Sequence, residues 1–164
     1  MRSYRGRCRK VGIPRPLTVR IVFDTNIYIS ALAIPGRNAE DAYLEAVHDT
    51  FELFTSVAIL TETARVLQTK CDWAEDKVRE AVQDISQMAT VLRPRRTLHL
   101  LADEPDNRIL ECAIDAQAEF VVSGDRRLLA LKHHADITMI PLADFLAKLR
   151  KSPQVGSGGH CGEK

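Results

Sequence analysis

Short apolar runs that alternate with helical patterns constrain the fold of this chain more than any other feature. The first run, residues 18–23 (TVRIVF), is β-branched with little polar alternation, which is typical of a strand buried on both faces of a parallel sheet. Further strands are expected at 51–54, 90–92, 120–123 and 137–140, and helices at 38–49, 56–67, 74–89, 105–118, 126–131 and 142–149. Asn38 is the expected cap of the first helix. Strands alternating with helices predict an α/β fold with a parallel sheet.

The length and composition indicate one folded domain with tails. The chain has 164 residues, 45% of them apolar, which is enough for one sizeable core. Arg-rich residues 1–17 and Gly/Ser-rich residues 151–164 predict a flexible basic leader and a flexible tail around a domain at 18–150. No run approaches the about 20 apolar residues that span a bilayer, and the leader lacks the apolar stretch of a secretory signal. We therefore expect a cytoplasmic protein with no membrane partner.

Charge is distributed unevenly along a chain whose net charge is +1. The first 20 residues carry seven basic side chains and no acid, whereas the remainder carries 16 basic and 22 acidic side chains, a net charge of −6. A slightly acidic body argues against a broad basic face for nucleic acid, because affinity for phosphate comes mainly from clustered Lys and Arg. Local contact with nucleic acid remains open.

The cysteines and histidines give little sign of a zinc or redox site. The four cysteines are far apart in the sequence, and no two have the close spacing that such sites need. We expect reduced, structurally ordinary thiols, and we expect His133 and His134 to lie in a polar loop after a short helix. The cysteines are Cys8, Cys71, Cys112 and Cys161.

Polar residues follow two of the predicted strands directly, at the sheet edge where open parallel sheets bind ligands. Asp24 and Asn26 follow the first strand, and Ser123 and Asp125 follow the fourth. Either aspartate alone could simply cap the next helix. The presence of both at strand ends favours a shared site.

Two further acids lie on helix faces that otherwise hold apolar residues. Glu62 shares a stripe with Ile59 and Val66, so it points at least partly inward, where an unpaired carboxylate is unfavourable. Asp106 lies in line with Ile109 on the buried face of its helix. The alternatives are an edge carboxylate that reaches solvent for Glu62 and, for Asp106, a first-turn acid favoured by the helix dipole, like the two acids before it.

Convergence of these carboxylates would have a chemical consequence. Their repulsion would raise their pKa values unless a cation lay between them, and no Lys or Arg within the motifs can serve all four. Oxygen ligands without His or Cys select Mg²⁺ or Mn²⁺ over zinc, and such ions usually act on phosphates. The expected chemistry is metal-assisted phosphodiester hydrolysis, in which one ion activates a water and a second, when present, stabilises the leaving oxygen. The acids are Asp24, Glu62, Asp106 and Asp125.

Three segments carry a specific resemblance to a known family. They are, in chain order, VFDTNIYISAL, LTETARVL and DEPDNRILECAIDAQAEFVVSGDRRLL. Their order and spacing resemble bacterial and archaeal PIN-domain proteins of the VapC type, toxins of toxin–antitoxin pairs, over about residues 20–149. The resemblance implies a three-layer α/β/α sandwich and a Mg²⁺- or Mn²⁺-dependent ribonuclease that leaves a 5′-phosphate. It also implies RNA as substrate, a protein antitoxin and a homodimer.

The resemblance also assigns roles to individual residues. Asn26 and Ser123 match small polar positions that assist the metal or its waters, and the family often has Thr where Ser123 stands. Arg126 and Arg127 adjoin the expected site and could contact RNA phosphate, with a solvated helix face as the alternative. The expected catalytic and metal-binding residues are Asp24, Glu62, Asp106 and Asp125.

Two other functions stay open at this point. A phosphatase of the haloacid-dehalogenase kind also has an Asp after its first strand, but its chemistry needs a second Asp two residues later, where this chain has Asn26. A non-catalytic PIN-like interaction module is disfavoured because all four acids are present. RNA cleavage that requires Mg²⁺ and spares a small phosphate ester would distinguish the three functions.

Overall fold

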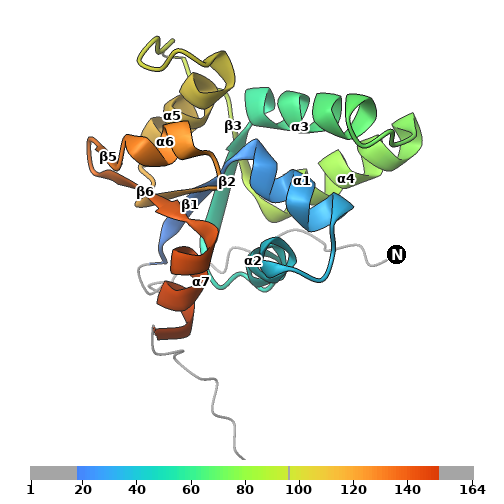
Figure 1. The fold of residues 1–164 in the computed structure, drawn as a ribbon, viewed down its shortest axis with the longest axis horizontal. Coiled ribbons are helices and arrows are strands. Elements are labelled where there is room, and N and C mark those ends of the chain that lie inside the picture. Colours follow the sequence, from blue (N-terminus) through green and yellow to red (C-terminus); the bar gives the residue numbers. More distant parts are fainter. Residues whose placement is uncertain (1–17, 96, 152–164) are drawn as a thin grey trace, which may run out of the picture.

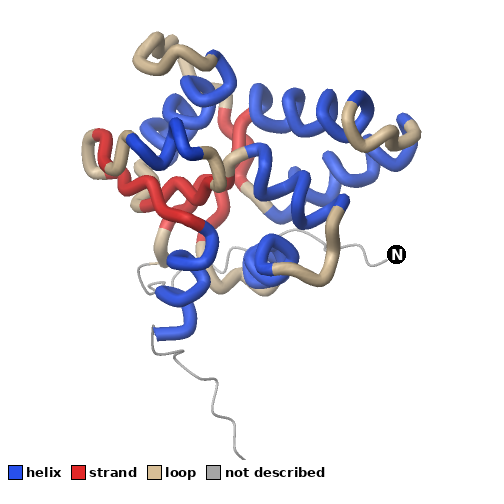
Figure 2. The backbone as a smooth tube through the Cα atoms, in the orientation of Figure 1, coloured by secondary structure: helices blue, strands red, loops and turns tan. Residues whose placement is uncertain are grey.

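A computed structural model describes residues 18–95 and 97–151, which form one sheet flanked by helices (Figures 1 and 2). The predicted leader and almost all of the predicted tail lie outside the described residues, as do Cys8 and Cys161. Lys151, the first residue of the predicted tail, is instead the last residue of a helix.

Six strands form the described sheet, in the order β3-β2-β1-β4-β6-β5. All neighbouring pairs are parallel except β5 and β6, which are antiparallel, so the predicted parallel sheet is confirmed with one added edge strand. The strands are β1 (Arg20–Phe23), β2 (Glu52–Ser56), β3 (Thr90–Leu92), β4 (Phe120–Ser123), β5 (His133–His134) and β6 (Ile137–Pro141).

The prediction that His133 and His134 lie in a polar loop is wrong, because these residues form β5. His134 pairs with Ile137, and His133 pairs with Thr138, whose hydroxyl oxygen lies 3.2 Å from His133 Nδ1. Ala135, in the turn between β5 and β6, has a positive φ of 52° that helps to reverse the chain. An edge strand accepts polar side chains, so backbone pairing with β6 prevails over the polarity of the two histidines.

The helices of the described region connect these strands. Each predicted helix is present with ends within two residues of the expected ones. Asn38 does not cap its helix, because it is already the first helical residue. The cap position falls on Arg37, whose side chain makes no capping hydrogen bond. The helices are α1 (Thr25–Ala33), α2 (Asn38–Val47), α3 (Val57–Thr69), α4 (Glu75–Met88), α5 (Glu104–Ala116), α6 (Arg126–Ala130) and α7 (Leu142–Lys151).

Helix α1 was not predicted from the sequence. Its β-branched residues Thr25, Ile27 and Ile29 are weak helix formers, and apolar residues occur around the whole helix, so no amphipathic stripe marks it. Burial of Ile27 and Tyr28 against the sheet stabilises the helix despite these propensities. The chain therefore passes from β1 into a helix at Asp24, with no intervening loop.

The helices cover both faces of the sheet, which confirms the three-layer α/β/α sandwich (Figure 1). Helix α5 packs against β1, β2, β3 and β4, while α1 and α7 pack on the opposite face and α2 lies against both of them. Phe23, the last residue of β1, contacts the rings of Tyr28, Phe51 and Phe145 at centroid distances of 5.7, 5.8 and 6.1 Å. These contacts fix the end of β1 and hence the position of Asp24.

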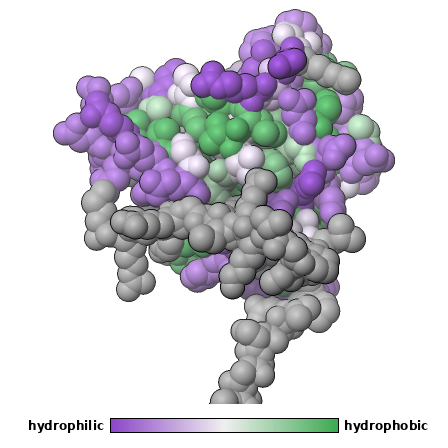
Figure 3. All heavy atoms as spheres, turned by 180° about the vertical axis from the view of Figure 1, so that it is seen from behind, coloured by the Kyte–Doolittle hydropathy of each residue, from purple (hydrophilic) through white to green (hydrophobic). Residues whose placement is uncertain are grey.

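The surface and the thiols add three observations. Across the described residues, no helix is both long and apolar enough to cross a membrane. The view from behind shows apolar surface in the middle of the molecule with hydrophilic residues on both sides (Figure 3). Cys71 is half-buried, Cys112 is buried, and both are free thiols.

Candidate metal centre

The candidate site lies at the carboxyl ends of β1 and β4, where the strand order reverses. From β1 the chain proceeds outward to β2 and β3 and then crosses to β4 on the other side of β1. The connections that leave β1 and β4 therefore run to opposite sides and open a crevice between them, which is the usual ligand site of such sheets. Asp24 follows β1 directly, and Asp125 follows β4 by two residues.

Ser123 joins the two strand ends. Its hydroxyl donates a hydrogen bond of 2.6 Å to Asp24 Oδ2 and accepts one of 2.9 Å from the backbone N–H of Asp125. The backbone N–H of Asp24 donates to the carbonyl of Val122 at 2.9 Å, which continues the pairing of β1 with β4. Ser123 is fully buried, and Asp24 is 5% exposed, so both side chains are held in one orientation.

Three carboxylates approach closely at this edge of the sheet. Asp103, Asp106 and Asp125 each offer an oxygen atom within 4.8 Å of the others. Asp103 occupies the N-cap position of α5 without a side-chain capping hydrogen bond, and Asp106 lies in the first turn of that helix. Asp125 caps α6, where its Oδ1 accepts a hydrogen bond of 2.9 Å from the backbone N–H of Arg127. Asp106 is only 4% exposed, and its Oδ2 has no hydrogen-bond partner among the described residues.

Asp103 is the member of this cluster that the sequence does not predict. An acid at the start of a helix is explained equally well by the helix dipole. The available signal was its spacing, because residues three apart on a helix lie on the same side. The cap position of Asp103 places it on the same side as Asp106, facing the end of β4.

The electrostatics show that these acids share one environment. Burial, followed by the negative charges of Asp125, Asp24 and Asp103, raises the pKa of Asp106 to about 6. Burial also raises the pKa of Asp24, and the charge of Asp125 adds to this, whereas the hydrogen bond from Ser123 opposes it. Asp24 therefore interacts electrostatically with Asp106 and Asp125, although its carboxylate oxygens are not among those that lie within 4.8 Å of one another.

Removal of the Ser123 hydroxyl is expected to raise the pKa of Asp24 further. Ser123→Ala removes the hydrogen bond that stabilises the charged form of Asp24 and leaves the backbone N–H of Asp125 without its acceptor. We expect a loss of about 1–2 kcal/mol in the free energy of unfolding. Titration of the Asp24 carboxyl carbon by NMR and chemical denaturation measure both effects. Ser123→Thr keeps the hydroxyl and serves as the control, and an unchanged Asp24 titration in Ser123→Ala would contradict the proposed coupling.

Glu62 occupies a different environment from the aspartates. It is half-buried on α3, where Arg65 donates two hydrogen bonds to its carboxylate, from Nε at 3.0 Å and from Nη2 at 2.7 Å. These hydrogen bonds lower the pKa of Glu62, in contrast to the raised values of Asp24 and Asp106. The structure thus brings Asp24, Asp106 and Asp125 together, whereas Glu62 stands outside the close cluster and has a cationic partner of its own.

The remaining expected site residues surround this cluster. Asn26 is exposed in the first turn of α1, and its backbone N–H, like that of Thr25, lowers the pKa of Asp24. Arg126 is exposed at the start of α6. Arg127 Nη1 lies 3.4 Å from Asp103 Oδ2, and the positive charge of Arg127 lowers the pKa of Asp106. Arg127 is therefore a partial counter-charge to the acids.

These residues fit a hard divalent cation. The cluster offers only carboxylate oxygens, the ligands preferred by Mg²⁺ and Mn²⁺, and a buried oxygen of Asp106 has no hydrogen-bond donor within residues 18–95 and 97–151. One arginine at 3.4 Å cannot neutralise three aspartates and Asp24 together. A bound divalent cation would satisfy the free oxygen and relieve the repulsion that raises the pKa of Asp106.

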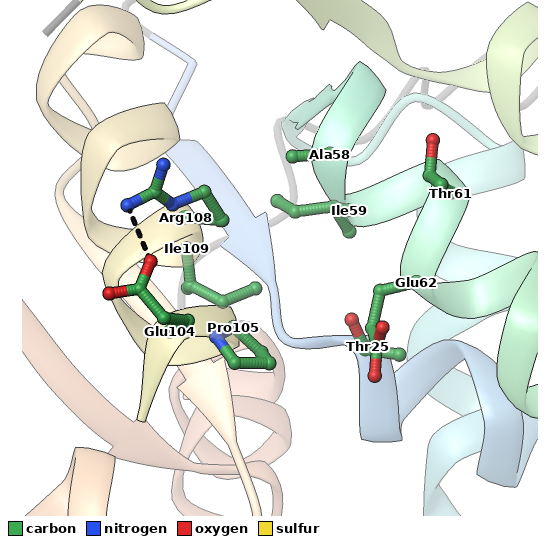
Figure 4. A pocket seen from close by; sticks show the side chains of 9 residues that line it. All are labelled: Thr25, Ala58, Ile59, Thr61, Glu62, Glu104, Pro105, Arg108 and Ile109. Carbon is green, nitrogen blue, oxygen red and sulfur yellow. Dashed lines mark hydrogen bonds and ion pairs between the residues drawn. The ribbon is translucent and has the colours of Figure 1, made fainter. Parts of the chain in front are cut away.

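A cavity of about 340 Å³ lies beside the acids, between α3 and α5 (Figure 4). Ala58 and Ile59 project into it from α3, and Pro105 and Ile109 form the facing wall on α5. Thr25, the residue after Asp24, also lines it. The cavity is thus contiguous with the chain segments that carry the acids.

The fold and the acidic cluster together define an α/β/α sandwich with a carboxylate site at the edge of the sheet where the strand order reverses, between β1 and β4. The chain belongs to the PIN domain family, whose sequence model matches residues 20–127. This range includes Asp24, Glu62, Asp106 and Asp125. PIN domains are in general nucleases that bind divalent metals.

Individual proteins are similar to this chain in sequence or in fold. The chain is 26% identical over 124 residues to the uncharacterized protein MJ1680 of Methanocaldococcus jannaschii, covering 71% of this chain and 77% of that protein. It is similar in structure to PAE2754 from Pyrobaculum aerophilum, with a TM-score of 0.55, 15% identity and coverage of 81% and 90% of the two chains. It is also similar to VapBC2 from Rickettsia felis bound to a promoter DNA fragment, with a TM-score of 0.53, 13% identity and coverage of 75% and 98%. At these identities the two structures show a shared fold.

Proposed function

We propose that this protein is a Mg²⁺- or Mn²⁺-dependent endoribonuclease that hydrolyses phosphodiester bonds of RNA. The observation that carries the proposal is the buried, unpartnered oxygen of Asp106 among Asp24, Asp103 and Asp125. Four neighbouring carboxylates repel phosphate in the absence of a cation, so an anionic substrate requires a divalent ion at this position. Membership of the PIN family supports the choice of a nucleic-acid phosphodiester over a small phosphate ester.

The proposed roles follow from where each side chain lies. Asp106 and Asp125 hold the ion together with Asp103, and Asp24 contributes from the end of β1. Ser123 and Asn26 orient Asp24 and its surroundings. When bound, Mg²⁺ or Mn²⁺ supplies Lewis-acid activation of water and of the phosphodiester. Glu62 completes the acidic set from α3, and the exposed side chains of Arg126 and Arg127 contact RNA phosphate beside the acids.

The test of this proposal is metal-dependent cleavage of RNA. The full chain, purified free of metal, is incubated with a mixed-sequence RNA in EDTA, Mg²⁺ or Mn²⁺, and with a small phosphate ester under the same conditions. We expect cleavage of RNA only with metal and no turnover of the ester. Turnover of the ester without cleavage of RNA would favour a phosphatase, and no turnover of either substrate would favour a non-catalytic module.

We further propose that the protein is the toxin of a type II toxin–antitoxin pair, acts in the cytoplasm and forms a homodimer. The fold shared with VapBC2 of Rickettsia felis supports this assignment. The inhibitor would be a protein that covers the acidic site. Co-expression with the product of an adjacent small reading frame should suppress RNA cleavage and give a stable complex. Light scattering of the toxin alone should give the mass of two chains.

Replacement of Glu62 by Gln is expected to weaken metal binding less than replacement of any clustered aspartate. Glu62 is half-exposed, lies outside the close cluster and already has Arg65 as its partner, so we expect about a tenfold loss of Mn²⁺ affinity or less, the low end for residues around a metal site. Calorimetric titration of Mn²⁺ into Glu62→Gln and into Asp125→Asn measures the difference. An equal loss in the two variants would place Glu62 in direct contact with the ion.

A further inference from the structure

The cavity between α3 and α5 has the size and lining of a small-molecule subsite. Its volume of about 340 Å³ is at the low end of the range for ligand pockets, about 300–1,000 Å³, which suits one nucleoside better than a folded element of another protein. Ile59 and Ile109 line it but are only 1% exposed, so the exposed side chains of Ala58 and Pro105 supply most of its accessible apolar surface (Figure 4). These walls can hold a planar ring by apolar contact.

The cavity adjoins the chain segments that carry the acidic cluster. Thr25, on its edge, follows Asp24 in the sequence, and Pro105 separates Asp103 from Asp106. A phosphodiester bound over the acids would therefore have a flanking nucleoside within reach of the cavity. Single-stranded RNA presents unstacked bases whose faces and edges are accessible to protein side chains.

The charged groups of the rim favour a base over a phosphate. Glu62 and Glu104 both line the cavity, and Arg108, the cation among its lining residues, is bound to Glu104 at 3.1 Å and to the carbonyl of Leu98 at 3.2 Å. Each carboxylate of the rim thus has an arginine partner, Arg65 for Glu62 and Arg108 for Glu104, so the lining residues leave no unpaired cation for a phosphate. Arg65 fixes the carboxylate of Glu62 and keeps it ionised, so at neutral pH Glu62 can only accept hydrogen bonds.

We propose that this cavity binds a nucleobase next to the scissile phosphate and that Glu62 selects bases with an exocyclic amino group. Adenine, cytosine and guanine each carry such a group, whereas uracil presents a carbonyl oxygen at the corresponding position of its edge. The inference rests on the proposed ribonuclease function, because it takes RNA as the ligand. Binding of an apolar side chain from a protein partner is the competing occupant.

Cytidine and uridine are the matched probes for this proposal, since they differ by one amino group and carry no phosphate. The full chain, labelled at isoleucine methyl groups, is titrated with each nucleoside in EDTA. We expect saturable shifts of the Ile59 and Ile109 methyl signals with cytidine. Uridine should bind about tenfold more weakly, because it lacks the amino group that donates a hydrogen bond to the charged carboxylate of Glu62. The methyl group of Ile137, on β6, serves as the internal control and should not shift.

Two variants separate apolar contact from base selection. Ala58→Leu, at an exposed position of α3, should fill the mouth of the cavity and abolish both sets of shifts without changing the melting temperature. Glu62→Gln should bring cytidine and uridine to within twofold of each other. If neither nucleoside shifts Ile59 and Ile109 in the parent protein, the cavity is not a base site. If both nucleosides bind equally to the parent, Glu62 does not select the base.

The failure of this inference is distinguishable from the failure of the proposed function. The nucleoside titration uses neither metal nor cleavage, and the RNA assay with Mg²⁺ and EDTA uses no nucleoside. RNA cleavage without nucleoside binding would overturn the base subsite alone. Substitution of each nucleotide near the cleavage position by an abasic one should raise KM about tenfold at one flanking position and little elsewhere. A uniform response at all positions would contradict the subsite.

Discussion

Replacement of Asp106 by Asn is expected to abolish metal-dependent RNA cleavage and to make the metal-free protein more stable. Asp106 is buried among like charges that raise its pKa to about 6, so its ionised form is unfavourable in the folded protein near neutral pH. The neutral isostere removes this repulsion, and we expect a gain of roughly 1–3 kcal/mol in unfolding free energy near neutral pH. Cleavage should fall about 100-fold or more. Replacing residues that only surround a metal's direct ligands lowers metal affinity or activity by about 10- to 100-fold, and Asp106 is proposed to hold the ion directly.

The matched control for this variant lies on the same helix. Asp115→Asn is the same chemical change at an exposed position of α5, and it should alter stability by no more than about 0.5 kcal/mol and leave cleavage unchanged. Urea denaturation in EDTA and a single-turnover cleavage assay in Mg²⁺ give the two readouts. A destabilised Asp106→Asn that still cuts RNA would mean that Asp106 is a structural cap and not a ligand.

The acids at strand ends and on a buried helix face could be predicted because their positions follow from simple geometry. A residue after a buried parallel strand lies at the carboxyl edge of the sheet, which places Asp24 and Asp125 together once the strands are recognised. Asp106 was predicted from helix phase, because Ile109 and Leu110 on the same face are buried. In each case the burial of neighbouring apolar residues determines where the acid points.

Asp103 and Glu62 show what this type of reasoning does not supply. Asp103 lies at the start of α5, where an acid is favoured by the helix dipole alone, so the sequence offers no reason to separate a member of an acidic cluster from a simple helix-terminal acid. Glu62 has the helix phase of an inward residue, but Arg65, three residues later, binds its carboxylate in the folded protein. Side-chain pairing of this kind depends on rotamers, which hydrophobic periodicity does not specify.

Local propensity misled the prediction at two segments of the fold. Helix α1 consists largely of β-branched and apolar residues, and its burial between the sheet and α2 and α3 stabilises a helix that the pattern does not indicate. Strand β5 consists of two histidines, and it exists because β6 offers an unpaired edge. Tertiary contacts decide both cases, so one sequence read by propensity alone could not supply either element.

Magnesium is expected to raise the melting temperature of the protein, and this rise should grow with pH. In the metal-free protein the pKa of Asp106 is raised from 3.8 to about 6, first by burial and then by the neighbouring aspartates, so the folded state binds this proton more tightly than the unfolded chain. The stability that this proton contributes is present in full below about pH 4 and is lost as the pH rises through about 6. Mg²⁺ binds the ionised carboxylate, so its stabilising effect increases over the same pH range.

Calorimetric melts of the full chain at two pH values measure this linkage. At a Mg²⁺ concentration about 100 times its Kd, binding contributes about 2.7 kcal/mol. This free energy corresponds to a rise of roughly 5–10 °C in melting temperature for a protein of this size, expected near pH 7.5. Near pH 5 the rise should be smaller, because protons compete with Mg²⁺ for Asp106, and Asp106→Asn should show little rise at either pH. Equal rises at both pH values in the parent, or a full rise in Asp106→Asn, would exclude Asp106 as a ligand, because a site elsewhere would not respond to the ionisation of this carboxylate.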